Sequence, residues 1–241
     1  VIKLNLVNDR GIHICKSMLA YKLFGEGATP ESAGKKSDHF VGDYYVKYAT
    51  EVKNAPEMEK EASEMLRLWE DGDPSTIELW KKMNNWAVSG IKQTYDRMGI
   101  SFTDIEYESN VYLFGKEVVA EGLTKGAFYK ESDGSVWVNN EDIGLDKKAL
   151  LRSDGTSIYI TQDMGTAVAR QKKYKFDKLI YVVGSEQIYH FKTLFAIFRK
   201  LDYQWASNCY HLSYGMVNLP EGKMKSREGN VVDADNLLDL L

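Results

Sequence analysis

The segment 178–190, KLIYVVGSEQIYH, decides the predicted fold. Its β-branched and aromatic run is typical of a buried strand, and Gly184 with the polar residues after it is typical of the turn that ends one. Outward from this segment, apolar spacing predicts strands at 157–161, 178–183 and 209–216, with helices at 164–174 and 188–201. This βαβαβ order predicts an α/β fold with a parallel sheet and right-handed crossovers.

The two ends of the chain are predicted to form one core. Residues 1–7 read as a strand, and Asn8-Asp9-Arg10-Gly11 reads as the turn before a helix. We expect the first part of the core at 1–27, an insertion at 28–150 and the second part of the core at 151–241. Because the chain starts with Val1 inside an apolar run, we also expect a piece of a longer chain.

The insertion is predicted to contain a helical pair and β-hairpins. Apolar residues recur at helical spacing over 57–98, where Ser75 and Glu78 have the spacing of a capping box for the second helix. Asp133-Gly134 and Asp154-Gly155 supply the positive φ angles of tight turns between strand-like runs. Residues 28–55 are polar and of mixed composition, and we expect a mobile loop at 34–37.

Composition places the chain among ordinary globular proteins. Of its 241 residues, 44% are apolar and 27% charged, which argues against disorder. A net charge of −4 excludes a whole-surface binder of nucleic acid, although it leaves room for a local basic patch. Cys15 and Cys209 lie far apart without metal-ligand spacing, so we expect a reduced, cytoplasmic protein without a metal site. No apolar run approaches the ~18 residues of a membrane span.

Polar side chains follow two predicted strands, at the edge where parallel sheets bind ligands. Tyr159 and Asp163 follow the first strand, and Glu186 and Gln187 follow the second. Asp163 suits a guanidinium, which it would bind through a bidentate charge-assisted pair, while Gln187 offers an amide and Glu186 an acceptor for ribose hydroxyls. The alternatives are structural. Asp163 would then be a helix N-terminal carboxylate that matches the macrodipole, Tyr159 a half-buried strand aromatic, and Glu186 and Gln187 first-turn residues.

The segment 221–230, EGKMKSREGN, concentrates three cations and a hydroxyl between two glycines. A flexible basic loop after a strand can close on a triphosphate and neutralise the charge that develops in nucleotidyl transfer. The pattern is not a P-loop, and the alternative that composition alone favours is a solvated basic loop. No motif of the serine hydrolases, dinucleotide oxidoreductases or zinc proteins is present in the sequence.

Taken in order, these motifs resemble one enzyme family. GKMKSREGNVV at 222–232 looks like the K-M-S-K-S loop of class I aminoacyl-tRNA synthetases, and more narrowly like the K-M-S-x-R-x-G-x-V-V form of arginyl-tRNA synthetases. LRSDGTSIYITQD at 151–163 is similar to that family's strand before the amino-acid pocket, and YVVGSEQIYHF at 181–191 to its next strand and turn. Asn8-Asp9-x-Gly11 matches the turn after its second strand. The resemblance covers nearly the whole chain.

The resemblance implies a Rossmann-like parallel sheet, the class I synthetase catalytic core, and an ATP-dependent reaction in two steps. L-Arginine attacks the α-phosphorus of ATP, which is bound with Mg²⁺, to give arginyl-adenylate and pyrophosphate. The arginyl group then passes to the 3′ end of tRNA(Arg). Activation itself can require the tRNA in this family. The implied partners are L-arginine, ATP and tRNA(Arg), and we expect a cytoplasmic monomer that does not bind membranes.

The family's pattern also implies roles for single residues. Asp163 pairs with the substrate guanidinium, Tyr159 packs on or bonds to the arginine, and Gln187 is the pocket glutamine. Positions beside ATP are matched by Gly184, Glu186 and His190. Asn8, Asp9 and Gly11 are candidates for a pocket rim, with an ordinary turn stabilised by side-chain hydrogen bonds as the alternative that we favour slightly.

The basic loop matches the part of the family's site that closes over the phosphates. Its members are Lys223, Met224, Lys225, Ser226 and Arg227, of which Lys223, Ser226 and Arg227 are the catalytic candidates. Ser226 stands where many class I enzymes have lysine, so either Lys225 or Arg227 is left to take that phosphate contact.

Two parts of the family's pattern are missing from this sequence: the H-I-G-H signature after the first strand and the anticodon-binding helical domain. We therefore expect a catalytic-domain fragment that is inactive or weak in arginylation on its own. Two competing functions remain: another class I synthetase, and an isolated arginine- or nucleotide-binding module. The carboxylate of Asp163 favours arginine over the side chains that other class I synthetases bind.

Overall fold

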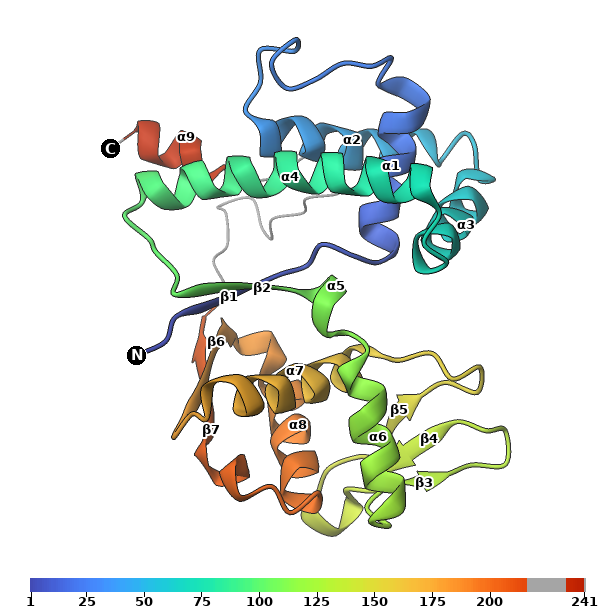
Figure 1. The fold of residues 1–241 in the computed structure, drawn as a ribbon, viewed down its shortest axis with the longest axis vertical. Helices are drawn as coiled ribbons and strands as arrows, with labels where there is room; N and C mark the ends of the chain where they lie inside the picture. The colour runs from blue at the N-terminus through green and yellow to red at the C-terminus, as the bar shows by residue number, and fades with distance from the viewer. Residues whose placement is uncertain (216–232, 241) are drawn as a thin grey trace. The chain divides into compact units, whose positions relative to one another are not determined.

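The structure, a computed structural model, describes residues 1–215 and 233–240. The chain forms two compact units: Val1–Glu108 together with helix α9, and the residues from Ser109 to the end of strand β7. Both units combine helices with paired strands, which confirms the predicted α/β class (Figure 1). The predicted division into two core segments and an insertion stays a prediction.

The first unit joins a two-stranded parallel sheet to a group of helices. Its elements are β1 (Leu4–Val7), α1 (Ile12–Phe24), α2 (Ser37–Glu51), α3 (Met58–Glu70), α4 (Pro74–Arg97), β2 (Asp104–Tyr107) and α9 (Ala234–Asp239). The register of β1 against β2 runs from Leu4↔Asp104 to Val7↔Tyr107, so a strand lies where residues 1–7 predicted one. Helices α1 to α4 share a buried core that includes Met18, Met65 and Met83.

Helix α2 lies where the sequence predicted a mixed polar segment. Phe40 and Tyr48 are buried on it, and Tyr44 between them packs against the same core. Aromatic side chains four residues apart lie on one face of a helix, so this segment carries the sequence pattern of a helix with one buried face. Gly42 and the β-branched residues of this segment lower its helix propensity, which is why no helix was predicted here.

The predicted helical pair is confirmed as α3 and α4, but its cap is different. Asp73 is the N-cap of α4 and accepts a hydrogen bond from the backbone N–H of Thr76, while Pro74 occupies the first helical position. The first N–H groups of a helix have no carbonyl partner within that helix. Proline at the first position has no N–H to leave unpaired, and the Asp73 carboxylate accepts from the N–H of Thr76. The predicted capping box of Ser75 and Glu78 is therefore wrong, because the cap lies two residues earlier.

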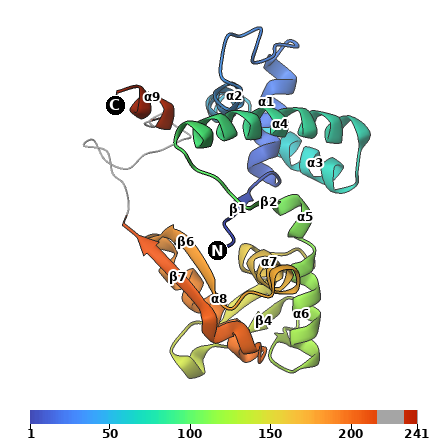
Figure 2. The ribbon, with the colours of Figure 1, turned by 60° about the vertical axis from the view of Figure 1, so that its left-hand side comes forward.

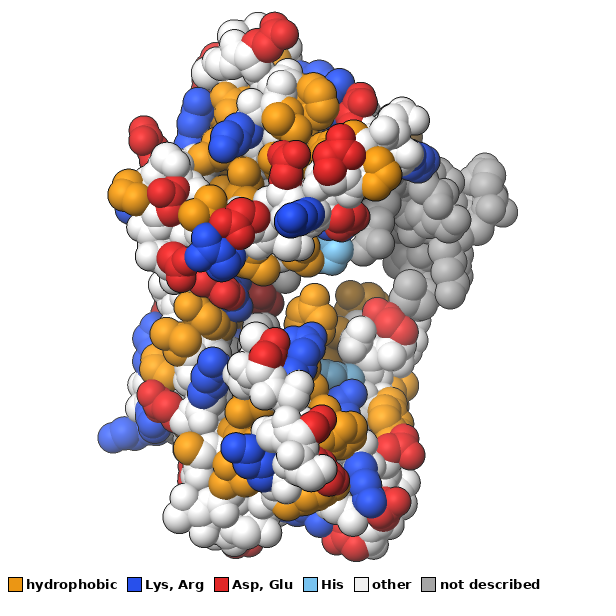
Figure 3. Space-filling view, turned by 90° about the vertical axis from the view of Figure 1, so that its right-hand side faces the viewer, with side chains coloured by type: hydrophobic (Ala, Val, Ile, Leu, Met, Phe, Trp, Pro, Cys, Tyr) orange, Lys and Arg blue, Asp and Glu red, His pale blue; other side chains and the backbone are white. Residues whose placement is uncertain are grey.

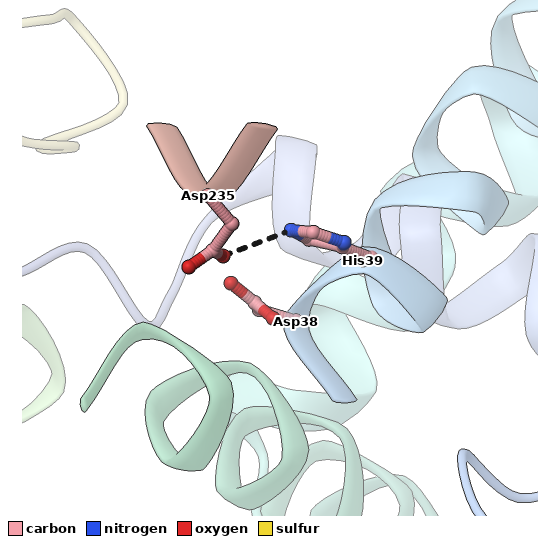
Figure 4. A group of neighbouring side chains, drawn as sticks. All are labelled: Asp38, His39 and Asp235. Carbon is pink, nitrogen blue, oxygen red and sulfur yellow. Dashed lines mark ion pairs between the residues drawn. The ribbon is translucent and has the colours of Figure 1, made fainter. Parts of the chain in front are cut away.

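Helix α9 is fastened within the first unit by ion pairs around Lys36. The Lys36 ammonium lies 2.6 Å from Asp235, 3.0 Å from Asp38 and 2.5 Å from the hydroxyl of Thr94. Figure 4 shows Asp235 of α9 facing His39 and Asp38 of α2, with the His39 imidazole 3.5 Å from Asp235. The cluster therefore joins α9 to the start of α2 and to the C-terminal part of α4.

This cluster predicts that α9 detaches in acid. The hydrogen bond from Lys36 holds the pKa of Asp235 below its usual range. A carboxylate whose pKa is lowered by folding contributes stability above its unfolded pKa of about 4, and the contribution is lost as the pH falls through the lower, folded value. We expect the α9 amides to be more protected against hydrogen exchange at about pH 6 than in acid, with the protection lost progressively as the pH falls below about 4. Lys36→Met should lower them already at neutral pH, and protection that persists in acid would contradict the prediction.

The second unit contains an antiparallel and a parallel sheet. Its elements are α5 (Glu108–Val111), which begins at the boundary, α6 (Phe114–Thr124), β3 (Tyr129–Lys130), β4 (Val136–Val138), β5 (Lys148–Leu151), α7 (Tyr159–Tyr174), β6 (Leu179–Gly184), α8 (Ile188–Lys200) and β7 (Cys209–Tyr214), with short 3₁₀ helices η1 (Glu141–Ile143), η2 (Ser185–Gln187) and η3 (Gln204–Asn208). β6 and β7 pair in parallel from Leu179↔Cys209 to Gly184↔Tyr214 and lie side by side in Figures 1 and 2. Helix α8 connects them, as the sequence predicted.

One of the two predicted hairpins is confirmed. Strands β3 and β4 flank Asp133-Gly134 and pair antiparallel, and β5 adds a third strand to their sheet. After Asp154-Gly155 the chain forms an isolated bridge between Leu151 and Ser157 and then enters α7. The predicted strand at 157–161 is therefore wrong, because the chain enters α7 at Tyr159 and Ile160 is buried on the first turn of that helix.

Helices α6 and α7 approach so closely that only glycine fits where they meet. A Cβ on Gly165 would overlap the backbone nitrogen of Gly115 and lie 2.7 Å from the backbone carbonyl carbon of Phe114. A Cβ on Gly115 would in turn overlap the carbonyl of Thr161. Backbone atoms cannot move aside as a flexible side chain can, so the start of α7 is fixed against the backbone of α6.

Both cysteines are free thiols whose surroundings suppress reactivity. Burial raises the pKa of Cys15 to about 11 and that of Cys209 to about 12. Because the thiolate is the nucleophile, we expect a chromogenic disulfide reagent to label neither thiol within minutes at about pH 8, and to label both rapidly after unfolding in urea. A Cys209→Ser variant assigns any residual signal, and rapid labelling of Cys15 in the native chain would contradict this prediction.

The surface that Figure 3 shows mixes acidic and basic side chains, so neither sign forms a broad field on that face. Among residues 1–215 and 233–240, the structure contains no helix with the length and apolar character that crossing a bilayer requires.

Candidate functional site

The sequence-predicted ligand residues of the second unit lie around the end of β6 and the starts of α7 and α8. Tyr159 is the first residue of α7, and Asp163 follows one turn later. Gly184 ends β6, Glu186 and Gln187 belong to η2, and His190 lies in the first turn of α8. The chain therefore brings these residues to the carboxyl end of a parallel strand, where ligands of α/β proteins bind.

Tyr159 and Asp163 present a shared helical face. Four residues apart on α7, their side chains project from the same side of the helix. Tyr159 is 69% exposed, so the alternative of a half-buried strand aromatic is wrong. No acidic residue lies in the first turn of α7, and the macrodipole acts mainly within that turn. Asp163 therefore gains little from the helix macrodipole, and its role in binding a ligand stays a prediction.

Asp163 forms an ion pair that sequence reasoning did not anticipate. Its Oδ2 lies 2.7 Å from Nε2 of His190, and the two side chains are 33% and 22% exposed. The contact joins the start of α7 to the start of α8. A carboxylate accepts from a ring N–H in this arrangement and keeps lone pairs on both oxygens for a further donor.

A group of largely buried side chains supports this pair. The Tyr181 hydroxyl is buried, and burial raises the pKa of Tyr181, with Arg170 acting in the opposite direction and Asp163 reinforcing the rise. The guanidinium carbon of Arg170 lies 5.8 Å from the centre of the Tyr181 ring. The Nε2–H of His211 donates to the carbonyl of Val183 at 2.9 Å. Sequence reasoning missed these residues, although an arginine on the apolar side of α7 was a visible signal.

Gly184 and Glu186 form a compact turn after β6. A Cβ at Gly184 would occupy the space of the Glu186 carboxylate, which folds back over the end of the strand. Glu186 and Gln187 are both exposed. Their carboxylate and amide are thus accessible to a ligand at this edge of the sheet.

The turn Asn8-Asp9-Arg10-Gly11 belongs to the first unit and is held by α4. The carbonyl of Asp9 accepts from the indole N–H of Trp80 at 2.5 Å and from the amide of Asn84 at 3.1 Å. Gly11 precedes α1 with a φ of 105°, a conformation that favours glycine. These contacts explain the turn structurally, and its role as a pocket rim stays a prediction. The loop candidates Lys223, Met224, Lys225, Ser226 and Arg227 lie outside the described residues.

Comparison with known proteins reveals close relatives. A family model described as tRNA synthetases class I (R), catalytic domain, matches residues 1–240. An arginine–tRNA ligase of Treponema denticola is 60% identical over 243 residues, covering 100% of this chain and 41% of that protein. One of Bacteroides thetaiotaomicron is 56% identical over 256 residues, covering 99% of this chain and 43% of that protein. The chain thus spans less than half the length of these curated relatives.

Solved structures share the fold. The arginyl-tRNA synthetase of Thermus thermophilus superposes with a TM-score of 0.74 at 19% identity, over 100% of this chain and 45% of that one. The arginyl-tRNA synthetase of Plasmodium falciparum gives a TM-score of 0.69 at 16% identity, over 89% of this chain and 36% of that one. At these identities the likeness concerns the fold, and it agrees with the predicted class I catalytic architecture.

Proposed function

We propose a function from one premise that the family match establishes: the chain belongs to the class I tRNA synthetases (R), whose catalytic-domain model it matches over residues 1–240. The protein that contains it is an arginine–tRNA ligase. It activates L-arginine with ATP and transfers the arginyl group to tRNA(Arg). The relatives that carry this name are longer than the chain, so the activity is proposed for the whole protein.

The observation that carries the proposal is the partly exposed carboxylate of Asp163 on the same helical face as Tyr159. A carboxylate binds a guanidinium through two parallel charge-assisted hydrogen bonds, a geometry that other side chains of substrate amino acids cannot use. The Tyr159 ring offers a flat face for stacking on the guanidinium plane. Gln187, at the end of η2, adds an amide that can both donate and accept.

The ATP end of the site is proposed from the family's pattern. The absence of a side chain at Gly184 lets the Glu186 carboxylate fold over the end of β6, and that exposed residue is suited to ribose hydroxyls. The loop residues Lys223, Met224, Lys225, Ser226 and Arg227 would neutralise phosphate charge, with Lys225 or Arg227 in place of the missing lysine. Mg²⁺ enters as part of the MgATP substrate, and a cytoplasmic monomer is the expected form.

The test is tRNA charging by the full-length protein with each amino acid in turn. The reaction mixture contains tRNA from the start, because the family can require it for activation. We expect arginine to be charged at least about 100-fold more efficiently than lysine or citrulline, since a site that is built to pair a guanidinium rejects analogues that leave its carboxylate unpaired. Equal or better charging of another amino acid would refute the proposal and favour another class I synthetase. Tight arginine binding without charging would favour a binding module.

A further inference from the structure

The ion pair between His190 and Asp163 joins two helices at one exposed edge. The two residues lie 27 positions apart in the sequence, and His190 Nε2 approaches one carboxylate oxygen only, Oδ2, at 2.7 Å. Both side chains keep partial exposure, at 22% for His190 and 33% for Asp163. The carboxylate of Asp163 is therefore still accessible from solvent while it is bonded to His190.

We propose that His190 is a positioning residue for Asp163 in arginine recognition, instead of a contact to ATP. This rests on the proposed function, because it takes the arginine guanidinium as the ligand of Asp163. A carboxylate has about four lone-pair sites on its two oxygens, and a bidentate guanidinium uses two of them. By occupying one site on Oδ2, His190 fixes the rotation of the Asp163 side chain and leaves enough sites for the fork. Fixing that rotation before binding reduces the entropy that arginine binding must overcome.

The surroundings of His190 make it a rigid support. Its ring meets the buried ring of Phe191 edge-on at 5.5 Å between centroids. Phe191 in turn packs against the His211 ring at 4.3 Å, and His211 is bonded to the Val183 carbonyl. The imidazole is therefore held against Phe191 of α8, which itself packs on His211 of β7, and the carboxylate is held against the imidazole.

The chemistry of histidine fits this role better than that of lysine or arginine. The imidazole offers Asp163 a single ring N–H, from Nε2 at 2.7 Å from Oδ2. A permanent cation at this place would repel the incoming guanidinium and compete for the carboxylate. Histidine therefore orients Asp163 while leaving its negative charge for the substrate.

The test uses steady-state charging by the full-length protein with saturating tRNA. His190→Ala is expected to raise KM for arginine about tenfold while KM for ATP stays within about twofold, because loss of one hydrogen bond to a charged group weakens only the ligand that this group binds. His190→Gln keeps a side-chain N–H donor and should recover part of the loss. Lys192→Gln is the matched control, since it removes a charge from an exposed position of the same helix and should leave both KM values unchanged.

A double-mutant cycle with Asp163→Asn separates positioning from independent binding. If His190 acts through Asp163, adding His190→Ala to Asp163→Asn should change kcat/KM for arginine by less than about twofold. Additive effects, or a larger rise in KM for ATP than for arginine, would overturn the inference. Thermal unfolding of each variant distinguishes these outcomes from a folding defect.

The wild-type protein keeps the two proposals apart. A full-length wild type that does not charge tRNA with arginine overturns the proposed function. A wild type that charges arginine, combined with a folded His190→Ala variant whose arginine KM is unchanged, overturns only the positioning role of His190.

Discussion

Asp163→Asn in the full-length protein is expected to lower kcat/KM for arginine by about 10²–10³-fold while KM for ATP changes little. Asparagine keeps the size of aspartate, but it removes the negative charge and turns one acceptor into a donor that faces the donors of the guanidinium. It also weakens the contact to His190 Nε2, which lies 2.7 Å from the native carboxylate. Both losses fall on arginine recognition, so arginine binding should suffer far more than ATP binding.

The measurement is arginine- and ATP-dependent charging kinetics, with Asp142→Asn as the matched control. Asp142 is an exposed carboxylate that pairs with Lys200 at 2.9 Å. Lys200 lies at the other end of α8 from His190. The same chemical change there should leave kcat/KM for arginine within about twofold of the wild type, because exposed ion pairs contribute little. An Asp163→Asn protein that is folded and has unchanged arginine kinetics would remove Asp163 from the pocket.

The second large effect is on stability. Gly165→Ala places a methyl group against the backbone of Gly115 and Phe114, where α6 and α7 meet. Because backbone atoms of two helices must separate, we expect the second unit to lose about 3 kcal/mol or more of unfolding free energy, less the roughly 1 kcal/mol that alanine gains in helix propensity. A net loss of this size corresponds to a Tm lowered by about 10 °C for a unit of about 100 residues.

Gly42→Ala is the matched control for this substitution. Gly42 also lies within a helix, α2, but a Cβ there meets no atom within 4 Å. The change should therefore be neutral or raise stability by up to about 1 kcal/mol through helix propensity alone. Equal Tm values for the two variants would show that α6 and α7 can separate without cost.

Local patterns in the sequence were sufficient to predict a helix or a strand where a single pattern dominated the segment. The run before Gly184 became β6, the turn at Asp133-Gly134 became a hairpin, and the helical spacing over 57–98 became α3 and α4. Prediction failed where two signals conflicted. In 157–161 the β-branched and aromatic residues favour a strand, but the turn at Gly155 places Ile160 against the core as part of a helix.

The candidate site also has a part that the sequence could predict and a part that it could not. The place of Glu186 and Gln187 directly after a strand was predictable, because it depends on the local pattern that ends β6, whereas Asp163 lies on a helix and not after the predicted strand. The pairing of Asp163 with His190 was not predictable, because it depends on how two helices of the second unit pack. Arg170 and Tyr181 were missed for the same reason, since burial is a property of the folded unit.

Lys36 has a consequence for the order of events during synthesis. Its partner Asp38 is two residues away, whereas Asp235 is 199 residues away. At about 5–20 residues per second, a ribosome needs roughly 10–40 s to make the intervening chain. During that interval the ammonium of Lys36 has its local carboxylate but not its distant one. The newly made helices of the first unit therefore keep one ion pair of Lys36 unformed until α9 emerges.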